Sequence, residues 1–227
     1  MTEKKAPPKK RELTREKILA SALVLFRRRG FEKTTMRDVA RAAKVAVGAA
    51  YYYFPSKEAL VLAYYHDTQD EHSRRARTAM AAETTLRARV GAIMHTKLDV
   101  LAKDRKLLGA IFKSVADPDD PLSIFGQTSR DVRDESMRLF DEALTGASDG
   151  AFDVLADDTR KIVSRALWGL HMGLLLYYLH DASPGQEKTR ALTDGALDLA
   201  VQLVSIAPLL GGLTDPLAAL LSNAGLL

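Results

Sequence analysis

Residues 34–57 read TTMRDVARAAKVAVGAAYYYFPSK, and this stretch decides the fold of the chain. Thr35, followed three residues later by Asp38, forms a capping-box pattern that predicts the start of a short helix. Apolar residues then recur at the spacing of one buried helix face: Met36, Val39, Ala40 and Ala43.

A sharp corner and a second helix follow. Lys44-Val45-Ala46 is too short for a loop between independent helices. The second helix is expected from Val47 to Phe54, because Pro55 pushes the residue before it out of the helical region. Ser56 is expected to cap a further helix that begins at Lys57. Two helices joined so tightly predict a helix-turn-helix, whose second helix usually reads the major groove.

The second helix has an unusual outward face. Ala50 and Phe54 are expected to point inward, and no acid occurs between Val39 and Phe54. The outward residues are small or aromatic: Ala46, Val47, Ala49, Tyr51, Tyr52 and Tyr53. Such a face suits an approach to phosphates and base edges. The alternative is an ordinary helical hairpin whose tyrosines fill a core.

From about Thr14 to Tyr65 the chain resembles the DNA-binding domain of the TetR family of bacterial transcription regulators. The matching pieces are TREKIL at 14–19, LFRRRGF at 25–31, TTMRDVA at 34–40 and VGAAYYYFPSKEAL at 47–60. Three residues depart from the family pattern. Lys44 stands where glycine is usual in the turn, Ala46 where a serine caps the recognition helix, and Val47 where a basic residue is common. These departures suggest an unusual base preference.

The resemblance implies an all-α fold with two domains. A disordered basic arm is expected over residues 1–12, and a helix-turn-helix DNA-binding domain of three helices over 13–70. A larger helical domain for effector binding and dimerisation is expected over 71–227. The helix that starts near Ser56 would link the two domains.

The charge distribution agrees with this division. Residues 1–60 hold eight Lys and seven Arg against five Glu and one Asp, a net charge of +9, which leaves −5 for the rest of a chain whose total is +4. A basic head on an acidic body is typical of a nucleic-acid-binding domain attached to a domain with another role.

Composition excludes several classes of chemistry. The chain has 227 residues and no cysteine, so disulfides, thiolate metal sites and cysteine nucleophiles are excluded. No two of its five histidines lie four residues apart, and no phosphate loop or nucleophile elbow is present. We therefore expect no enzyme activity, no metal and no cofactor. The longest apolar run, 166–179, is too short to span a bilayer, so a cytoplasmic protein without a membrane partner is expected.

The body shows helical periodicity and no convincing strand. Helices are expected near 84–103, 105–116, 121–145, 157–180 and 186–207, with a further short one within 215–227. The segment 162–179 is apolar all round, which predicts burial on more than one side. TetR-like regulators usually dimerise through their last two long helices. The candidate dimer residues are therefore Leu167, Leu170, Leu174, Tyr178, Leu192, Ala196, Leu199 and Leu203.

An effector site in the body is also implied by the resemblance. Large aromatics, methionines and a few polar groups commonly line ligand cavities, although the same residues more often form plain core. The candidates are Met94, His95, Leu98, Ile111, Phe112, Phe125, Met137, Phe140, Trp168, His171 and Met172. The expected effector is an apolar, partly aromatic or acyl-like small molecule, with His95 and His171 as its polar contacts.

The sequence thus predicts a homodimer that binds a palindromic DNA operator and represses transcription until the effector releases it. Phosphate contacts are expected from Thr34, Thr35, Tyr51, Tyr53 and Lys57, and base contacts from Arg37, Val47, Gly48, Ala49 and Tyr52. Three alternatives stay open at this stage. They are a DNA-binding activator or architectural protein without an effector, an enzyme, and a helical interaction protein that never touches DNA.

Overall fold

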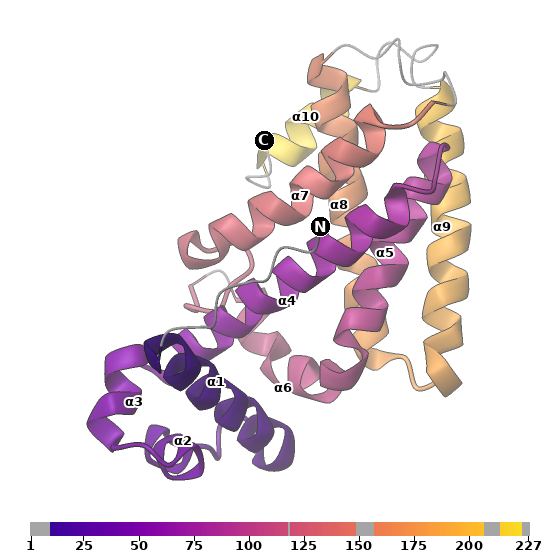
Figure 1. The fold of residues 1–227 in the computed structure, drawn as a ribbon. Coiled ribbons are helices and arrows are strands. Elements are labelled where there is room, and N and C mark those ends of the chain that lie inside the picture. Colours follow the sequence, from indigo (N-terminus) through magenta and orange to yellow (C-terminus); the bar gives the residue numbers. More distant parts are fainter. Residues whose placement is uncertain (1–9, 118, 149–156, 207–213, 224–227) are drawn as a thin grey trace, which may run out of the picture. The chain divides into compact units, whose positions relative to one another are not determined.

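The computed structural model describes residues 10–117, 119–148, 157–206 and 214–223. Within these residues every regular element is a helix, as predicted, and Figure 1 shows their order along the chain. The chain divides into two compact units: residues 1–67 with 104–129, and residues 68–103 with 130–227.

The first unit begins with one long helix and two short ones. They are α1 (Lys10–Arg29), α2 (Met36–Ala43) and α3 (Val47–Tyr53). The helix α1 begins at Lys10, within the stretch 1–12 that was expected to be a disordered arm, and residues 1–9 of that arm fall outside the described residues. Gly30 ends α1 at a φ of 85°, a backbone conformation that glycine adopts without strain.

The long helix α4 (Lys57–Met80) contributes to both units, and α6 (Arg105–Ala116) belongs to the first. The Ser56 hydroxyl accepts a hydrogen bond from the Ala59 amide at 3.2 Å, which confirms the predicted cap of α4. A 3-10 turn, Gln127–Ser129, closes the unit.

Residues 104–129 join the core of the first unit, although the sequence interpretation assigned them to the body. Leu107, Ile111 and Leu122 pack with the buried side chains of α1–α4. The buried carboxylate of Asp104 accepts hydrogen bonds from Arg27 Nε at 2.5 Å and from the Tyr64 hydroxyl at 3.0 Å. This ion pair fixes the start of α6 to α1 and α4.

The second unit is built from the rest of α4 and five further helices. These are α5 (Leu86–Leu101), α7 (Arg130–Thr145), α8 (Asp157–His180), α9 (Glu187–Ile206) and α10 (Thr214–Asn223). The predicted single helix over 121–145 is wrong. Turns occupy 120–126, where Asp120 and Ser123 accept backbone hydrogen bonds, and α7 begins only at Arg130.

The helix α8 is the central element of the second unit. It packs against α5, α7, α9 and α10. By length and composition its segment Thr159–His180 could cross a membrane, but half of the most apolar window is buried inside the folded chain. That is the pattern of a core helix.

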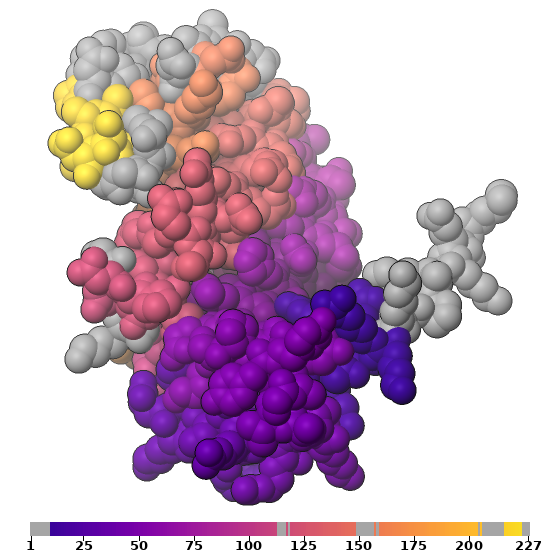
Figure 2. All heavy atoms as spheres, turned by 90° about the vertical axis from the view of Figure 1, so that its left-hand side faces the viewer, coloured from indigo at the N-terminus to yellow at the C-terminus, as the bar shows by residue number. Residues whose placement is uncertain are grey.

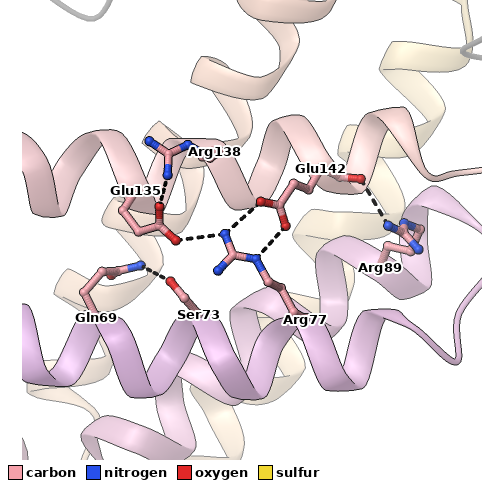
Figure 3. A network of polar contacts seen from close by, with 7 residues as sticks. All are labelled: Gln69, Ser73, Arg77, Arg89, Glu135, Arg138 and Glu142. Atoms are coloured by element: carbon pink, nitrogen blue, oxygen red, sulfur yellow. Dashed lines mark hydrogen bonds and ion pairs between the residues drawn. The ribbon is translucent and has the colours of Figure 1, made fainter.

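Polar contacts fasten α4 to α7 (Figure 3). The guanidinium of Arg77 donates to both oxygens of Glu142 at 2.7 and 2.9 Å, and to Glu135 at 2.8 Å. Arg89 of α5 donates to the carbonyls of Met80, Glu142 and Ala143, and so caps the C-terminal ends of α4 and α7 together.

Candidate DNA-binding surface

The capping box at Thr35 forms as the sequence predicts. The Thr35 amide and hydroxyl both donate to Asp38 Oδ2, at 3.1 and 2.7 Å, and the Asp38 amide donates back to Thr35 Oγ1 at 3.2 Å. These bonds to the ionised form lower the pKa of Asp38 below its ordinary value. They fix the first turn of α2 directly before the corner.

Lys44 explains why glycine is usual at the corner of this motif. Its φ of 53° and ψ of 47° are left-handed, and its amide is directed back at the carbonyls of Ala40 and Arg41. For an L-residue this conformation costs roughly 1–2 kcal/mol, whereas glycine adopts it freely. The corner keeps its geometry in this chain at the expense of local strain.

The helix α3 has one solvent-exposed face and one buried face. Ala50 and Phe54 are 0% and 3% exposed and point into the core, whereas Val47, Tyr51 and Tyr52 are 40%, 48% and 69% exposed. The atoms of this region, coloured violet, lie at the surface turned to the viewer in Figure 2. The alternative of tyrosines that fill a core is therefore wrong for Tyr51 and Tyr52.

The other α3 positions complete this face. Ala46 is exposed and starts the helix in an extended conformation without a side-chain cap, as its residue type predicted. A Cβ added at Gly48 would meet nothing within 4 Å, so the backbone there is accessible. Ala49 and Tyr53 are half-buried, and the Tyr53 ring lies edge-on to Tyr52 with ring centroids 5.3 Å apart.

The predicted phosphate contacts differ in their availability. Thr34 is 1% exposed, and its hydroxyl donates to the Gly30 carbonyl at 2.8 Å, so this side chain stabilises the turn between α1 and α2. Thr35 and Arg37 are exposed at the start of α2. The Lys57 ammonium donates to the Phe31 carbonyl at 3.0 Å and lies 4.4 Å from the Phe31 ring centroid.

Two arginines of α1 border α3, and the sequence interpretation gave neither a place beside the recognition helix. The guanidinium carbon of Arg11 lies 5.6 Å from the Tyr52 ring centroid, and that of Arg15 lies 5.1 Å from the Phe54 ring centroid. Their spacing of one helical turn was visible in the sequence. The sequence interpretation placed Arg11 in the basic arm over residues 1–12 and Arg15 near the start of the DNA-binding domain.

The predicted body residues divide between different surroundings. Ile111 belongs to the core of the first unit, and Phe125 is 50% exposed. Phe112 and Met172 are half-buried. His95 Nε2 lies 3.0 Å from Asp194 Oδ1 of α9. The remaining candidates are buried in the second unit: Met94, Leu98, Met137, Phe140, Trp168 and His171.

The predicted dimer residues also divide. Leu167, Leu174 and Tyr178 are buried within the second unit, and the Tyr178 hydroxyl donates to the Leu98 carbonyl at 3.2 Å. Leu170 and Ala196 are half-buried. Leu192, Leu199 and Leu203 are 46%, 58% and 53% exposed along one face of α9.

A capped helix, a tight corner and a second helix with an accessible face define a helix-turn-helix DNA-binding protein. Comparison with family models finds bacterial regulatory proteins of the tetR family over residues 18–64, and a tetracyclin repressor-like C-terminal domain over residues 89–219. The chain belongs to the TetR family of transcriptional regulators.

Individual relatives agree with this assignment. The uncharacterised regulator YuxN of Bacillus subtilis is 45% identical over 53 residues, which are 22% of this chain and 18% of that protein. The repressor KstR2 of Rhodococcus jostii is 32% identical over 87 residues, 38% of this chain and 43% of that protein. The matched regions span half or less of the first curated relatives' own lengths.

A solved structure extends the likeness of fold along most of the chain. The crystal structure of Thermus thermophilus FadR, a TetR-family repressor in complex with lauroyl-CoA, superposes with a TM-score of 0.61 at 24% identity. The superposition covers 84% of this chain and 92% of that one.

Proposed function

We propose that this regulator is a homodimer that binds a palindromic operator in the bacterial cytoplasm and represses transcription until a small apolar effector releases it. The observation that carries the proposal is the exposed face of α3, held by a buried inner face and a fixed corner. Because the inner face of α3 is buried and the corner is fixed, the exposed face is already ordered. Its small side chains can contact base edges with little loss of conformational entropy on binding.

The roles on DNA follow from residue type and exposure. Val47, Gly48 and Ala49 suit close approach to base edges, because their side chains are small and apolar groups contact thymine methyls. Tyr52 and Arg37 reach further from the same surface. Tyr51, Tyr53 and Lys57 are assigned to phosphates by residue type. The hydroxyl and amide of Thr34 donate to Gly30 and Phe31, and those of Thr35 donate to Asp38, so both threonines act through the fold of α2 and its preceding turn.

The proposed dimer surface combines α8 and α9. Leu176 and Tyr177 are each 42% exposed on α8, one to two turns beyond Gly169 and Gly173 on the same face. On α9, Leu192, Leu199 and Leu203 form an exposed apolar row. Apolar rows beside glycines would allow α8 and α9 of one protomer to pack closely against α8 and α9 of its partner. A C2 dimer of this kind carries two recognition helices related by the symmetry that a palindrome requires.

The proposed effector site lies in the second unit. Its interior holds Met94, Met137, Phe140 and Trp168, which suits an apolar ligand. The FadR relative is complexed with lauroyl-CoA, which supports an acyl-like molecule. The effector must bind the operator-competent and released geometries with different affinity, since otherwise it shifts nothing.

Selection from a pool of random duplex DNA at two salt concentrations tests the proposal. We expect one enriched palindrome, with affinity that falls steeply as salt rises because phosphate contacts release counterions. Sedimentation should show a dimer that Leu199→Glu disrupts and that Leu220→Glu, at an exposed leucine of α10, leaves intact. Recovery of no motif, or a monomer that binds its motif unchanged, would contradict the proposal.

A further inference from the structure

Three polar side chains from three helices meet within the apolar interior of the second unit. His72 of α4 and His171 of α8 are 0% and 1% exposed, and Lys97 of α5 is half-buried. The two imidazole rings stack with centroids 6.4 Å apart, and Phe140 lies 5.8 Å from His171. We refer to His72, Lys97 and His171, with Gln69 and Ser73 beside them, as the inner polar cluster.

Hydrogen bonds leave part of this cluster unsatisfied. His72 Nε2 lies 2.9 Å from the Ile93 carbonyl oxygen and must donate to it, so Nδ1 carries the lone pair of the neutral ring. Among the described residues, neither His72 Nδ1 nor His171 Nε2 has a hydrogen-bond partner. Buried polar atoms are nearly always paired, so two such atoms in one cluster indicate a missing partner.

The cluster also holds an uncompensated charge. The Lys97 ammonium donates to Gln69 Oε1 at 2.9 Å, and Gln69 Nε2 donates to Ser73 Oγ at 3.1 Å, as Figure 3 shows for the latter pair. Burial lowers the pKa of Lys97 to about 8, and no carboxylate of the described chain opposes this shift. The same ammonium contributes to lowering the pKa of both histidines. A buried charge without a counterion is unfavourable until an anion arrives.

We propose that the inner polar cluster binds the carboxylate of an amphipathic effector, whose apolar body lies beside Phe140 and Trp168. This inference rests on the proposed function and adds the chemical class of the ligand. Lys97 supplies the opposite charge, and His171 Nε2 supplies a second donor in the tautomer that carries its proton there. His72 stays neutral and makes no hydrogen bond to the anion, because its Nδ1 carries a lone pair.

A carboxylate fits the cluster better than the alternatives. An uncharged ligand would leave the ammonium without a counterion. A phosphate dianion would demand a second fixed cation, and the two histidines are held neutral by their surroundings at neutral pH. One fixed positive charge with flanking imidazoles matches one negative charge that accepts several hydrogen bonds.

Trp168 provides the assay, because it is the only tryptophan of the chain and lies one helical turn from His171. The full-length protein is titrated with dodecanoate and, as a matched uncharged probe, with dodecan-1-ol, while Trp168 fluorescence is recorded. We expect saturable binding of dodecanoate. Its affinity should exceed that of dodecan-1-ol at least about tenfold, the size expected for one charge-assisted bond.

Two variants separate charge from shape. Lys97→Met should weaken dodecanoate at least about tenfold and leave dodecan-1-ol within about twofold, since the apolar lining is kept. Lys103→Met removes an exposed lysine just beyond α5 and should match the wild type for both probes. His171→Phe should also weaken dodecanoate, because it removes the second donor, and it tests the inference independently of Lys97.

Equal affinity for the two probes would overturn the inference, as would dodecanoate binding that Lys97→Met leaves unchanged. Absence of saturable binding across octanoate to hexadecanoate would overturn it as well. Operator binding is measured on the same samples. Specific operator binding without carboxylate binding would contradict only the inference about the inner polar cluster. Carboxylate binding without specific DNA binding would contradict only the proposed regulator function.

Discussion

Lys97→Met should stabilise the ligand-free protein, and its effect should depend on pH in a defined way. Burial lowers the pKa of Lys97 from 10.5 to about 8. The charged form is therefore disfavoured in the folded state. At roughly 1.4 kcal/mol per pKa unit, the penalty at neutral pH is about 3 kcal/mol.

The variant also loses a favourable contact. Without the ammonium, the buried Gln69 loses the donor at 2.9 Å, which offsets about 1 kcal/mol of the gain. We expect a net stabilisation of about 2 kcal/mol at neutral pH.

The sign of the pH dependence separates the two contributions. The penalty on Lys97 is complete below its folded pKa of about 8 and disappears as pH rises toward 10.5. The hydrogen-bond contribution has no such dependence while Lys97 stays protonated. The advantage of Lys97→Met over the wild type should therefore shrink by about 1.4 kcal/mol between pH 7 and pH 9.

Urea unfolding of both proteins at one matched concentration, followed by Trp168 fluorescence and circular dichroism, measures this difference. Groups common to both proteins cancel, and Lys103→Met provides a control whose difference from the wild type should not change with pH. A Lys97→Met advantage that stays constant or grows from pH 7 to pH 9 would refute the reasoning about buried charge.

Three further predictions concern single side chains. Ala46→Ser restores a cap to α3 and should raise the free energy of unfolding by about 1 kcal/mol in urea titrations; no gain would show that α3 lacks a free amide to cap. Lys44→Gly relieves the left-handed strain and should raise thermal stability by about 0.5–1 kcal/mol; a loss would contradict the corner geometry. Burial lowers the pKa of His171 from 6.5 to about 3, so the neutral ring is favoured and its stabilising effect is lost as pH falls below 6.5. The wild type should lose roughly 2 kcal/mol of unfolding free energy through His171 between pH 7 and pH 5, and His171→Phe should not show this loss. If urea titrations show the same decrease for both proteins, burial of a neutral ring is contradicted.

The helix-turn-helix was predictable because its determinants are local in sequence. The Thr35–Asp38 capping box, the stop at Gly30 and the Ser56 cap each involve residues three or four positions apart. Such pairs form whatever the rest of the chain does. The sequence showed only that Lys44 replaces the glycine that is usual in the family. The positive φ of Lys44 explains why glycine is usual there.

Hydrophobic periodicity could not predict which of the two units a residue joins, or which side of a helix is buried. Asp104 looks like a surface acid until Arg27 and Tyr64 bring it into the first unit. On α8, apolar residues surround the helix, so the sequence could not tell that Leu167 and Leu174 face inward while Leu176 faces out.

The inner polar cluster was missed except for His171. Its other members lie on α4 and α5, at positions that only the packing of helices brings together. Their sequence surroundings resemble those of exposed polar residues, and no local spacing distinguishes them.

The central claim is that the exposed face of α3 reads base edges, and the most direct test compares the DNA motifs selected by wild type and by Tyr52→Ala. Tyr52 is the most exposed tyrosine of α3 at 69%. The account predicts one palindrome for the wild type. For Tyr52→Ala it predicts altered base preference at the same position of both half-sites, with the remaining positions unchanged. An identical motif from both proteins, or no motif from either, would contradict the claim.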